Sequence, residues 1–448
     1  MLRWFRNSEV IHGETREHIV MNADLGSVLT FEVTPVSEVA FPPSTAVGMT
    51  RFVSTTPEVE FRGNGGPGGL GDEGVQPTVW YRADAGVQTA PSGRVTRWDS
   101  SLAGGSPAQV LNIGREPLLL PQFGPRNAPA IRFEGAQALE APGFPLNRFT
   151  LFTVTSSQHP ANTFERYLLG HSSASQLHSL LLGTLNGVHQ AFLRGSGLSF
   201  SSVATLDGAP HTFVIERKIG NGGVGYVDGL RQGNFLQATS PANNSDWLIG
   251  AGFQTGAFYR GEVFEIILYP QGVGEVRRMI VEHYLAGRHG IPPAGQVIFQ
   301  DWDSHGMDIC GLGRSNSDRV ESAEGTGPLG MRSPTALSRN DYLLWGHDSG
   351  EKFRLVPYDQ NGFHFKLEHD WSIQITDGGD GDGVGLVDVT LRMSQLQLLA
   401  TPSRWALLLT EGGSTQVIPA TSYNPLEQLM IFPGIDLGTT RSLSFAIR

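Results

Sequence analysis

Short stretches in which apolar and polar residues alternate recur along most of the chain. This period of two is typical of half-buried β-strands. The first example is residues 27–33, where Leu29, Phe31 and Val33 fall on one face of the predicted strand. After residue 75 the clearest predicted strands are 150–155, 211–217, 223–227, 247–250, 261–269, 342–345, 363–367, 371–376, 387–391, 405–409, 416–418, 429–432 and 443–447. We therefore predict an all-β protein.

One segment has a helical period instead. Between residues 273 and 287 apolar residues recur at intervals of three and four, which predicts one short helix. These apolar residues are Val276, Met279, Ile280, Tyr284 and Leu285. Gly290 and the prolines at 292 and 293 mark its end. His283 lies on or beside the apolar stripe, where packing or a local hydrogen bond is favoured over a metal role.

The composition agrees with many short strands joined by tight turns. The chain has 57 glycines and 27 prolines in 448 residues, and only 17% of its residues are charged. Glycine supplies the positive φ of tight turns, and proline presets φ in others. A chain of this length predicts two or three domains. We place an N-terminal arm and glycine-rich linker at 1–74, one β-domain at 75–294 and a second β-domain at 295–448.

Two roles stay open for the arm. Its glycine-rich stretch, residues 63–71, predicts a flexible linker. An extended arm on such a linker could add a strand to the sheet edge of a neighbouring molecule. The alternative is that the arm packs on its own body as an ordinary pair of N-terminal strands.

Charge and apolar runs exclude some partners. The net charge of −11 argues against a nucleic-acid partner, because phosphate binding needs a positive surface. No run of 18 apolar residues occurs, so no membrane span is predicted. The chain starts without an apolar run of signal-peptide length, which leaves export and incorporation into a particle such as a virion both open. The one cysteine, Cys310, is interpreted as a small buried apolar residue.

Several segments between residues 75 and 290 match one family in the right order. They are Pro77–Gly86 (Pro-Thr-Val-Trp-Tyr-Arg-Ala-Asp-Ala-Gly), Gly93–Asp99, Pro129–Gly135, Phe149–Ser156, Tyr226–Gly229 (Tyr-Val-Asp-Gly), Gly261–Tyr269 and Glu282–Ala286 (Glu-His-Tyr-Leu-Ala). Together they resemble bacterial jelly-roll domains of the laminin-G and concanavalin A-like superfamily. Within them, Asp228-Gly229 also predicts a hairpin with a type I′ turn, which needs positive φ twice.

The second β-domain carries a weaker resemblance. Asp308–Arg314 and Tyr342–His347 resemble a β-domain of unknown function that follows such jelly rolls in Bacteroidota-type surface proteins. The resemblance implies two β-sandwich (jelly-roll) domains and an extracellular place, on a cell surface or on a virion or other particle. Those surface proteins usually carry a signal peptide and a sorting domain, and this sequence departs from them in showing neither pattern.

Catalytic patterns are missing from the sequence. Glycan hydrolases on this scaffold place two carboxylates on one strand face, so that the pair flanks the scissile bond. Glu58 and Glu60 share a face, but only in the arm. Glu262 and Glu265 are three residues apart, which predicts opposite faces of their strand. Gly311-Leu-Gly313 is half of a dinucleotide signature and is interpreted as a turn. We therefore predict a protein that is not an enzyme.

Calcium is the one cofactor that the sequence suggests. Asp377, Asp380 and Asp382 lie together in a glycine-rich run, and calcium takes hard oxygen ligands on a chain that can wrap around it. The run does not follow the spacing of an EF-hand loop. A solvated acidic hairpin loop is the favoured alternative.

Ligand contacts are predicted in two loops of the first β-domain. His159 and Asn162 lie in one loop, and Tyr259 and Arg260 lie in the other. Such residues bind glycans by stacking and hydrogen bonding. For the aromatic residues we favour an alternative, in which they cover the edge of the core or contact a neighbouring subunit.

Two functions follow from these expectations. The first is a non-enzymatic adhesion or recognition component of a larger assembly, which binds a glycan or a surface-protein receptor through the jelly-roll loops. The second is a structural subunit of a filament, sheath or virion, such as a fibre or decoration protein, that assembles with its own copies through the N-terminal arm.

Overall fold

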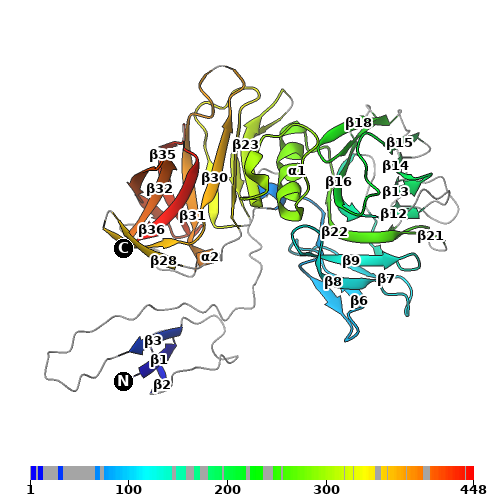
Figure 1. Cartoon of the computed structure of the whole chain (residues 1–448), viewed down its shortest axis with the longest axis horizontal. Helices are drawn as coiled ribbons and strands as arrows, with labels where there is room; N and C mark the ends of the chain where they lie inside the picture. Colours follow the sequence, from blue (N-terminus) through cyan, green and yellow to red (C-terminus); the bar gives the residue numbers. More distant parts are fainter. Residues whose placement is uncertain are drawn as a thin grey trace.

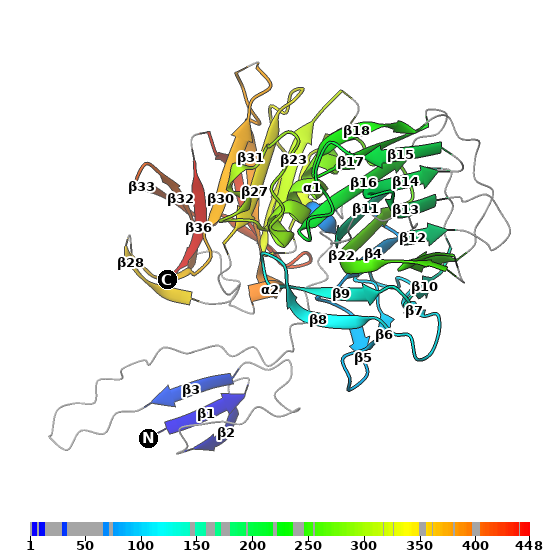
Figure 2. The same cartoon turned by 45° about the vertical axis from the view of Figure 1, so that its right-hand side comes forward.

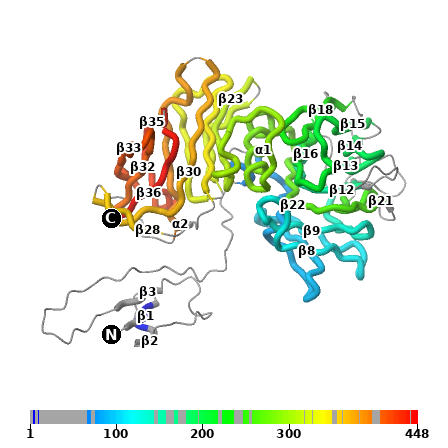
Figure 3. The backbone as a smooth tube through the Cα atoms, viewed as in Figure 1, coloured from blue at the N-terminus to red at the C-terminus, as the bar shows by residue number. Residues whose placement is uncertain are grey.

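A computed structural model describes most of the chain, and the chain can be followed as a tube in Figure 3. The described residues are 2–6, 9–13, 29–33, 66–70, 75–143, 148–157, 166–171, 180–193, 196–217, 222–235, 246–253, 256–316, 318–325, 327–348, 355–360, 362–379, 381–396, 404–438 and 440–448. They form mainly antiparallel sheets with one long helix between them (Figure 1). The prediction of an all-β protein built from β-sandwiches is confirmed. In the described part, α1 is the one helix longer than a single turn.

The arm contains a small sheet of its own. Its strands are β1 (Leu2–Arg6), β2 (Glu9–Gly13) and β3 (Leu29–Val33), in the order β2-β1-β3. Trp4 of β1 stands opposite His12 on one side and Phe31 on the other. The predicted strand at residues 27–33 is confirmed by β3, whereas the residues around Glu58 and Glu60 lie outside the described part. This sheet lies apart from the rest of the protein in both views (Figures 1 and 2).

Two large sheets form the first β-sandwich. The eight-stranded sheet contains β18 (Leu230–Phe235), β17 (Gly223–Val227), β16 (Pro210–Arg217), β11 (Phe149–Ser156), β22 (Arg260–Tyr269), β9 (Ala128–Glu134), β8 (Leu118–Phe123) and β4 (Val79–Arg82). The eleven-stranded sheet contains β15 (Ser196–Phe200), β14 (Val188–Leu193), β13 (Leu180–Leu185), β12 (Arg166–His171), β19 (Trp247–Ile249), β10 (Leu139–Ala141), β7 (Ala108–Val110), β6 (Val95–Trp98), β5 (Val87–Thr89), β20 (Ala251–Phe253) and β21 (Gly256–Phe258).

Large aromatic residues fill the space between these two sheets. The ring of Tyr81 packs 5.3 Å from that of Trp98 and 6.2 Å from that of Trp247, and all three side chains are fully buried. The hairpin predicted at Asp228-Gly229 is confirmed, with φ of 49° and 80° at its two turn residues. Asp228 also receives the backbone N–H of Thr212 at 2.8 Å, which joins the turn to β16.

The second β-sandwich also has two sheets. The nine-stranded sheet contains β24 (Arg319–Val320), β23 (Met307–Arg314), β27 (Tyr342–His347), β30 (Trp371–Thr376), β36 (Ser442–Ile447), β29 (Phe363–Leu367), β28 (Leu355–Gln360), β32 (Trp405–Glu411) and β33 (Ser414–Pro419). The five-stranded sheet contains β25 (Ser322–Glu324), β26 (Leu329–Arg332), β31 (Leu386–Arg392), β35 (Leu429–Asp436) and β34 (Ser422–Asn424). Two short helical turns, η3 (Gln300–Trp302) and α2 (Met393–Leu396), lie in the connections.

The turn predicted at Gly311-Leu-Gly313 is wrong, because these residues lie inside β23. The glycines are needed for close packing instead. A Cβ atom on Gly313 would lie 2.6 Å from the ring of Tyr342 and 3.0 Å from Val276 of the helix. Glycine inside a strand often marks such a close approach.

The helix α1 (Glu275–His289) lies between the two β-sandwiches (Figure 1). Its residues belong to one apolar cluster that also includes Phe152 of the first sandwich and Leu312 of the second. Asp318 of the second half accepts the N–H groups of Val276 and Arg277 at the helix N-terminus. The helix ends at Gly290, which has the left-handed φ of 66°. The predicted domain boundary near residue 294 stays a prediction, since the helix packs on both halves.

The glycine-rich stretch is not a flexible linker where the structure describes it. Gly66–Leu70, named here the inserted segment, contains the short helical turn η2 (Pro67–Gly69), and all five of its residues are buried. A Cβ atom on Gly68 would lie 2.9 Å from Ile280 of α1, and one on Gly69 would lie 3.0 Å from Cys310 of β23. The inserted segment therefore packs between α1 and the second β-sandwich. Cys310 is buried there, as predicted.

Candidate functional site

The predicted ligand contacts are only partly placed by the structure. His159 and Asn162 lie outside the described residues. Tyr259 is fully buried, and its hydroxyl donates to the carbonyl oxygen of Ser156 at 3.0 Å and lies 2.6 Å from Thr155 Oγ1. Burial raises its pKa. Tyr259 is therefore a core residue, which argues against a contact with a ligand and agrees with the alternative interpretation of this aromatic residue.

Arg260 lies at an exposed rim of the eight-stranded sheet, at the start of β22. Its Nε donates to the carbonyl oxygen of Glu134 at 3.1 Å. The side chain of Glu134 forms an ion pair with Arg94 at 3.3 Å, and both side chains are more than a third exposed. We call Arg94, Glu134 and Arg260 the rim cluster. Its two guanidinium groups offer donors to hydroxyl or carboxylate groups of a ligand.

The predicted calcium loop uses its first carboxylate for its own turn. Asp377 Oδ1 accepts the N–H groups of Gly379 at 2.8 Å and of Gly381 at 3.3 Å. Asp382 is exposed, and Asp380 lies outside the described residues. The hydrogen bonds at Asp377 are those expected of an acidic hairpin loop, and calcium binding here stays a prediction.

The sequence prediction for Glu262 and Glu265 is wrong, because β22 carries a β-bulge. The pairing of β11 with β22 shifts by one residue at this point, so Phe264 and Glu265 both point toward α1. Glu262 lies on the same face, since it pairs at 2.8 Å with Arg132, whose guanidinium lies over the ring of Phe123. A bulge breaks the period of two that the prediction assumed.

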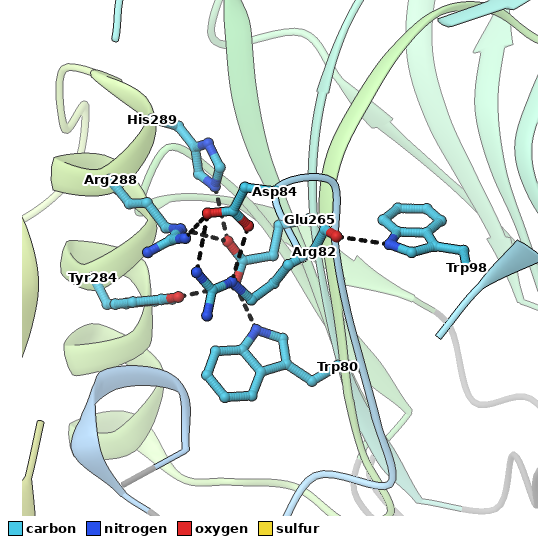
Figure 4. A network of polar contacts seen from close by, with 8 residues as sticks. All are labelled: Trp80, Arg82, Asp84, Trp98, Glu265, Tyr284, Arg288 and His289. Atoms are coloured by element: carbon cyan, nitrogen blue, oxygen red, sulfur yellow. Dashed lines mark hydrogen bonds and ion pairs between the residues drawn. The ribbon is translucent and has the colours of Figure 1, made fainter. Parts of the chain in front are cut away.

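Glu265 is the centre of a buried polar network (Figure 4). Its Oε1 accepts a hydrogen bond from Trp80 Nε1 at 2.6 Å and one from the Tyr284 hydroxyl at 3.1 Å. Its Oε2 lies 2.9 Å from His289 Nε2 and 3.5 Å from Arg288 Nε. The side chain of Glu265 is 1% exposed. The network therefore ties strands β4 and β22 to the last turn of α1.

Asp84 extends this network toward the surface. It forms an ion pair with Arg82 at 3.0 Å and a second one with Arg288. Trp98 Nε1 donates to the carbonyl oxygen of Arg82 at 2.7 Å, so the turn after β4 is also fixed to β6. Burial alone would raise the pKa of Asp84, but the charges of Arg288 and Arg82 lower it well below its ordinary value.

The charge state of Glu265 limits its chemistry. Burial tends to raise its pKa, but the hydrogen bond from His289 and the charge of Arg288 outweigh burial, so the pKa is lowered. A carboxylate that stays ionised cannot donate the proton that glycoside hydrolysis needs. The four hydrogen-bond and ion-pair partners of Glu265 come from β4 and from the C-terminal half of α1. In this chain these segments form a structural network.

One cluster in the second β-sandwich has the residue types of a metal site. Single donor atoms of His347, Asp348 and His369 all lie within 4.8 Å of one another. Sequence analysis missed this group, because the two histidines are 22 positions apart and no spacing rule joins them.

The fold defines a layered all-β protein in which two β-sandwiches pack on opposite sides of one helix. Among the helices of the described part, none has the length and apolar character needed to cross a membrane. No protein-family model and no curated protein matches the chain.

Some solved structures align with it at low similarity. Domain 4 of AbnA, an extracellular arabinanase from Geobacillus stearothermophilus, shares 12% identity over 46% of this chain and 98% of that domain, with a TM-score of 0.33. The binding domain of Paraclostridial Mosquitocidal Protein 1 shares 11% identity over 83% of this chain and 97% of its own, with a TM-score of 0.36. Trypanosoma rangeli sialidase shares 17% identity over 47% of this chain and 32% of its own, with a TM-score of 0.33. Likenesses at this level carry no argument about function.

Proposed function

We propose that the chain is a non-enzymatic recognition protein whose first β-sandwich binds a glycan or a surface-protein receptor at the rim cluster. The observation that carries this proposal is the burial of Glu265 under α1. The carboxylate of Glu265 is tied to four side chains and holds strands β4 and β22 to α1, so its role is structural. The lectin-like character that the sequence resemblance implies is part of the same proposal.

Solvent exposure supports binding rather than catalysis. Hydrolysis requires two carboxylates that flank a bond in an open cleft. Glu262 and Glu265 share a face, but the Glu265 side chain is 1% exposed and Glu262 is engaged by Arg132 and by Ser156 Oγ at 2.6 Å. In the rim cluster, by contrast, Arg94 and Glu134 are accessible to a ligand.

The charges of the rim cluster favour a ligand with acceptor groups. A guanidinium binds a carboxylate through two parallel hydrogen bonds and binds hydroxyl groups singly. Glu134 offers a neighbouring acceptor for a hydroxyl. An acidic or polyhydroxylated glycan presents both kinds of group, and an acidic loop of a protein receptor presents the first.

The alternative function, a structural subunit, is favoured by the arm. In the described part of the N-terminal sheet, β2 and β3 each pair only with β1, so each leaves one edge for another strand. An open edge of this kind is a template for pairing with another molecule. Assembly through the arm and binding at the rim cluster are compatible with each other.

A glycan array probed with the full chain tests the binding proposal. We expect binding to a defined glycan class, and we expect Arg260→Ala and Arg94→Ala to weaken it. Arg404→Ala is the matched control, because Arg404 is an exposed arginine in the second β-sandwich. Equal binding by all three variants would contradict a role for the rim cluster.

Mass photometry tests the alternative function, assembly through the arm. A truncated chain that starts at Gly63 keeps the inserted segment, so its body retains that contact with α1 and Cys310. If the full chain forms regular oligomers and the truncated chain does not, the arm is an assembly element. If both are monomers, strand addition by the arm is excluded under those conditions.

A further inference from the structure

Three neighbouring strands of the nine-stranded sheet bring four metal-binding side chains together. His347 is the last residue of β27, Asp348 follows it, and His369 lies two residues before Trp371 at the start of β30. Asp308 comes from β23, which pairs with β27 on its other side. The sheet order β23-β27-β30 therefore gathers residues that are far apart in sequence. We call His347, Asp348 and His369 the histidine cluster.

The geometry of the histidine cluster is compact. The donor atoms of its three residues lie within 4.8 Å of one another. His369 Nδ1 is 3.1 Å from Asp348 Oδ1, and the two imidazole rings are 4.4 Å apart. Trp371 packs against both rings, at 6.0 Å from His347 and 5.6 Å from His369, which restricts their movement. Small side-chain rotations bring three donors to the spacing of one coordinated ion.

Asp308 supplies a second and independent observation. Its Oδ2 lies 3.1 Å from His347 Nε2, and its side chain is 5% exposed. The other ring nitrogen, His347 Nδ1, faces the carbonyl oxygen of Asp348. A histidine that binds a metal through one nitrogen commonly donates its other N–H to a carboxylate, which fixes the ring and raises its basicity. Asp308 is placed to do this for His347.

We propose that the histidine cluster binds a divalent transition metal ion of the zinc class. His347 Nδ1, His369 Nδ1 and the Asp348 carboxylate are the ligands, and Asp308 orients His347. The ion takes the place of the proton that His347 Nδ1 donates to the carbonyl oxygen of Asp348, so this contact must open when the ion binds. Two imidazole nitrogens favour zinc, cobalt or nickel over calcium and magnesium, which prefer oxygen ligands. The two aspartates supply two negative charges, which match the charge of the ion.

The ligands of the proposed site differ in their exposure to solvent. The side chains of His347 and His369 are 3% and 0% exposed, whereas that of Asp348 is 39% exposed. Asp348 is therefore the ligand through which the site is most accessible to solvent. This site is separate from the rim cluster and from the acidic loop at Asp377, so it goes beyond the proposed function.

Titration of the chelator-treated full chain with Zn²⁺, Co²⁺ and Ca²⁺ tests the site. Isothermal titration calorimetry should show one Zn²⁺ per chain at this site, and an excess of Ca²⁺ should not displace it. Co²⁺ should give the intense visible absorption of a low-coordinate site with nitrogen ligands. Absence of stoichiometric Zn²⁺ binding would overturn the proposal.

Two variants and one control locate the ion. Asp348→Ala changes a partly exposed side chain and should abolish stoichiometric Zn²⁺ binding. Asp308→Asn keeps the shape of the side chain but weakens its hold on His347, and we expect affinity to fall by about 10–100-fold. His364→Ala removes an exposed histidine of β29 and should leave the affinity unchanged. Loss of binding in the His364 variant with retention in the Asp348 variant would place the ion elsewhere and refute the assignment.

Discussion

The packing of the inserted segment can be tested by the substitution Gly69→Ala, which adds a single methyl group. Gly69 has φ of 76°, and a Cβ atom at this position would lie 3.0 Å from Cys310 Sγ and 3.1 Å from the carbonyl oxygen of Glu324. In Gly69→Ala the left-handed backbone costs about 1–2 kcal/mol. The added methyl group is overpacked, which costs about 1–3 kcal/mol more. The variant should therefore lose roughly 2–5 kcal/mol of stability at this contact.

Gly104→Ala separates the two contributions. Gly104 has nearly the same φ, 73°, but a Cβ atom there meets nothing within 4 Å. This control carries the backbone strain without the packing clash. The difference between the two variants should be about 1–3 kcal/mol, which is the packing contribution alone.

Cys310 provides a local assay, because it is the one cysteine of the chain and is buried beside Gly69. Reaction with a thiol reagent requires local opening of this contact. Strain at Gly104 does not act on the Cys310 contact, and 1.4 kcal/mol corresponds to a factor of ten, so Gly69→Ala should react about 25–4,000-fold faster than Gly104→Ala. Equal rates in the two variants would refute the conclusion that the inserted segment packs on Cys310.

The remaining predictions concern buried charges. Burial raises the pKa of Glu282 to about 7 from 4.5, so this group stabilises the fold below about pH 4.5 and loses roughly 3 kcal/mol as pH rises to about 7. Glu282→Gln should remove that slope in urea unfolding, and an unchanged slope would contradict it. Burial lowers the pKa of His211, but its hydrogen bond to Asp228 outweighs this and raises the pKa above 6.5. Stability from this pair is present below pH 6.5 and is lost as pH rises through the raised pKa, so His211→Asn should be less stable mainly on the acidic side. Glu265→Gln removes one of the two carboxylates that pair with Arg288, the other being Asp84, and weakens the buried hydrogen bonds at this position, so it should cost about 1–3 kcal/mol in thermal or urea unfolding; a stability equal to that of the wild-type chain would contradict the network.

Alternation and helical period predicted the helix and many of the longer strands, but fewer than half of the strands in the described part. The strand predicted at 261–269 is β22, and the helix predicted at 273–287 is α1, which ends at Gly290 as expected. His283 also has the predicted local role. Its Nδ1 donates to the carbonyl oxygen of Met279, and its Nε2 accepts the N–H of Ile298. These features depend on neighbours in sequence, which is why the sequence shows them.

Features that depend on tertiary packing were not predictable in the same way. The glycines of β23 and of the inserted segment have the composition of turns and linkers, but each is closely approached by α1 or by a neighbouring strand. The bulge at Phe264 reverses the face of every residue before it in β22, and no residue type in this strand predicts a bulge. The histidine cluster depends on the order of strands in the sheet, which the periodicity of apolar residues along the sequence does not predict.

The residues of the Glu265 network were visible only as a family resemblance. Trp80 and Glu265 are 185 positions apart, so no local rule joins them. In the structure the opening segment, the closing strand and the helix meet at this network, which no spacing rule in the sequence predicts.

Binding and turnover measured on the same glycan sample test the central claim most directly. The full chain is incubated with glycans that it retains on an array, and the glycans are then recovered and analysed by mass spectrometry. We predict that the recovered glycans have unchanged masses and that Arg260→Ala weakens their retention. Release of shorter glycans by the wild-type chain, abolished by Glu265→Gln in a variant that still folds, would contradict a non-enzymatic recognition protein.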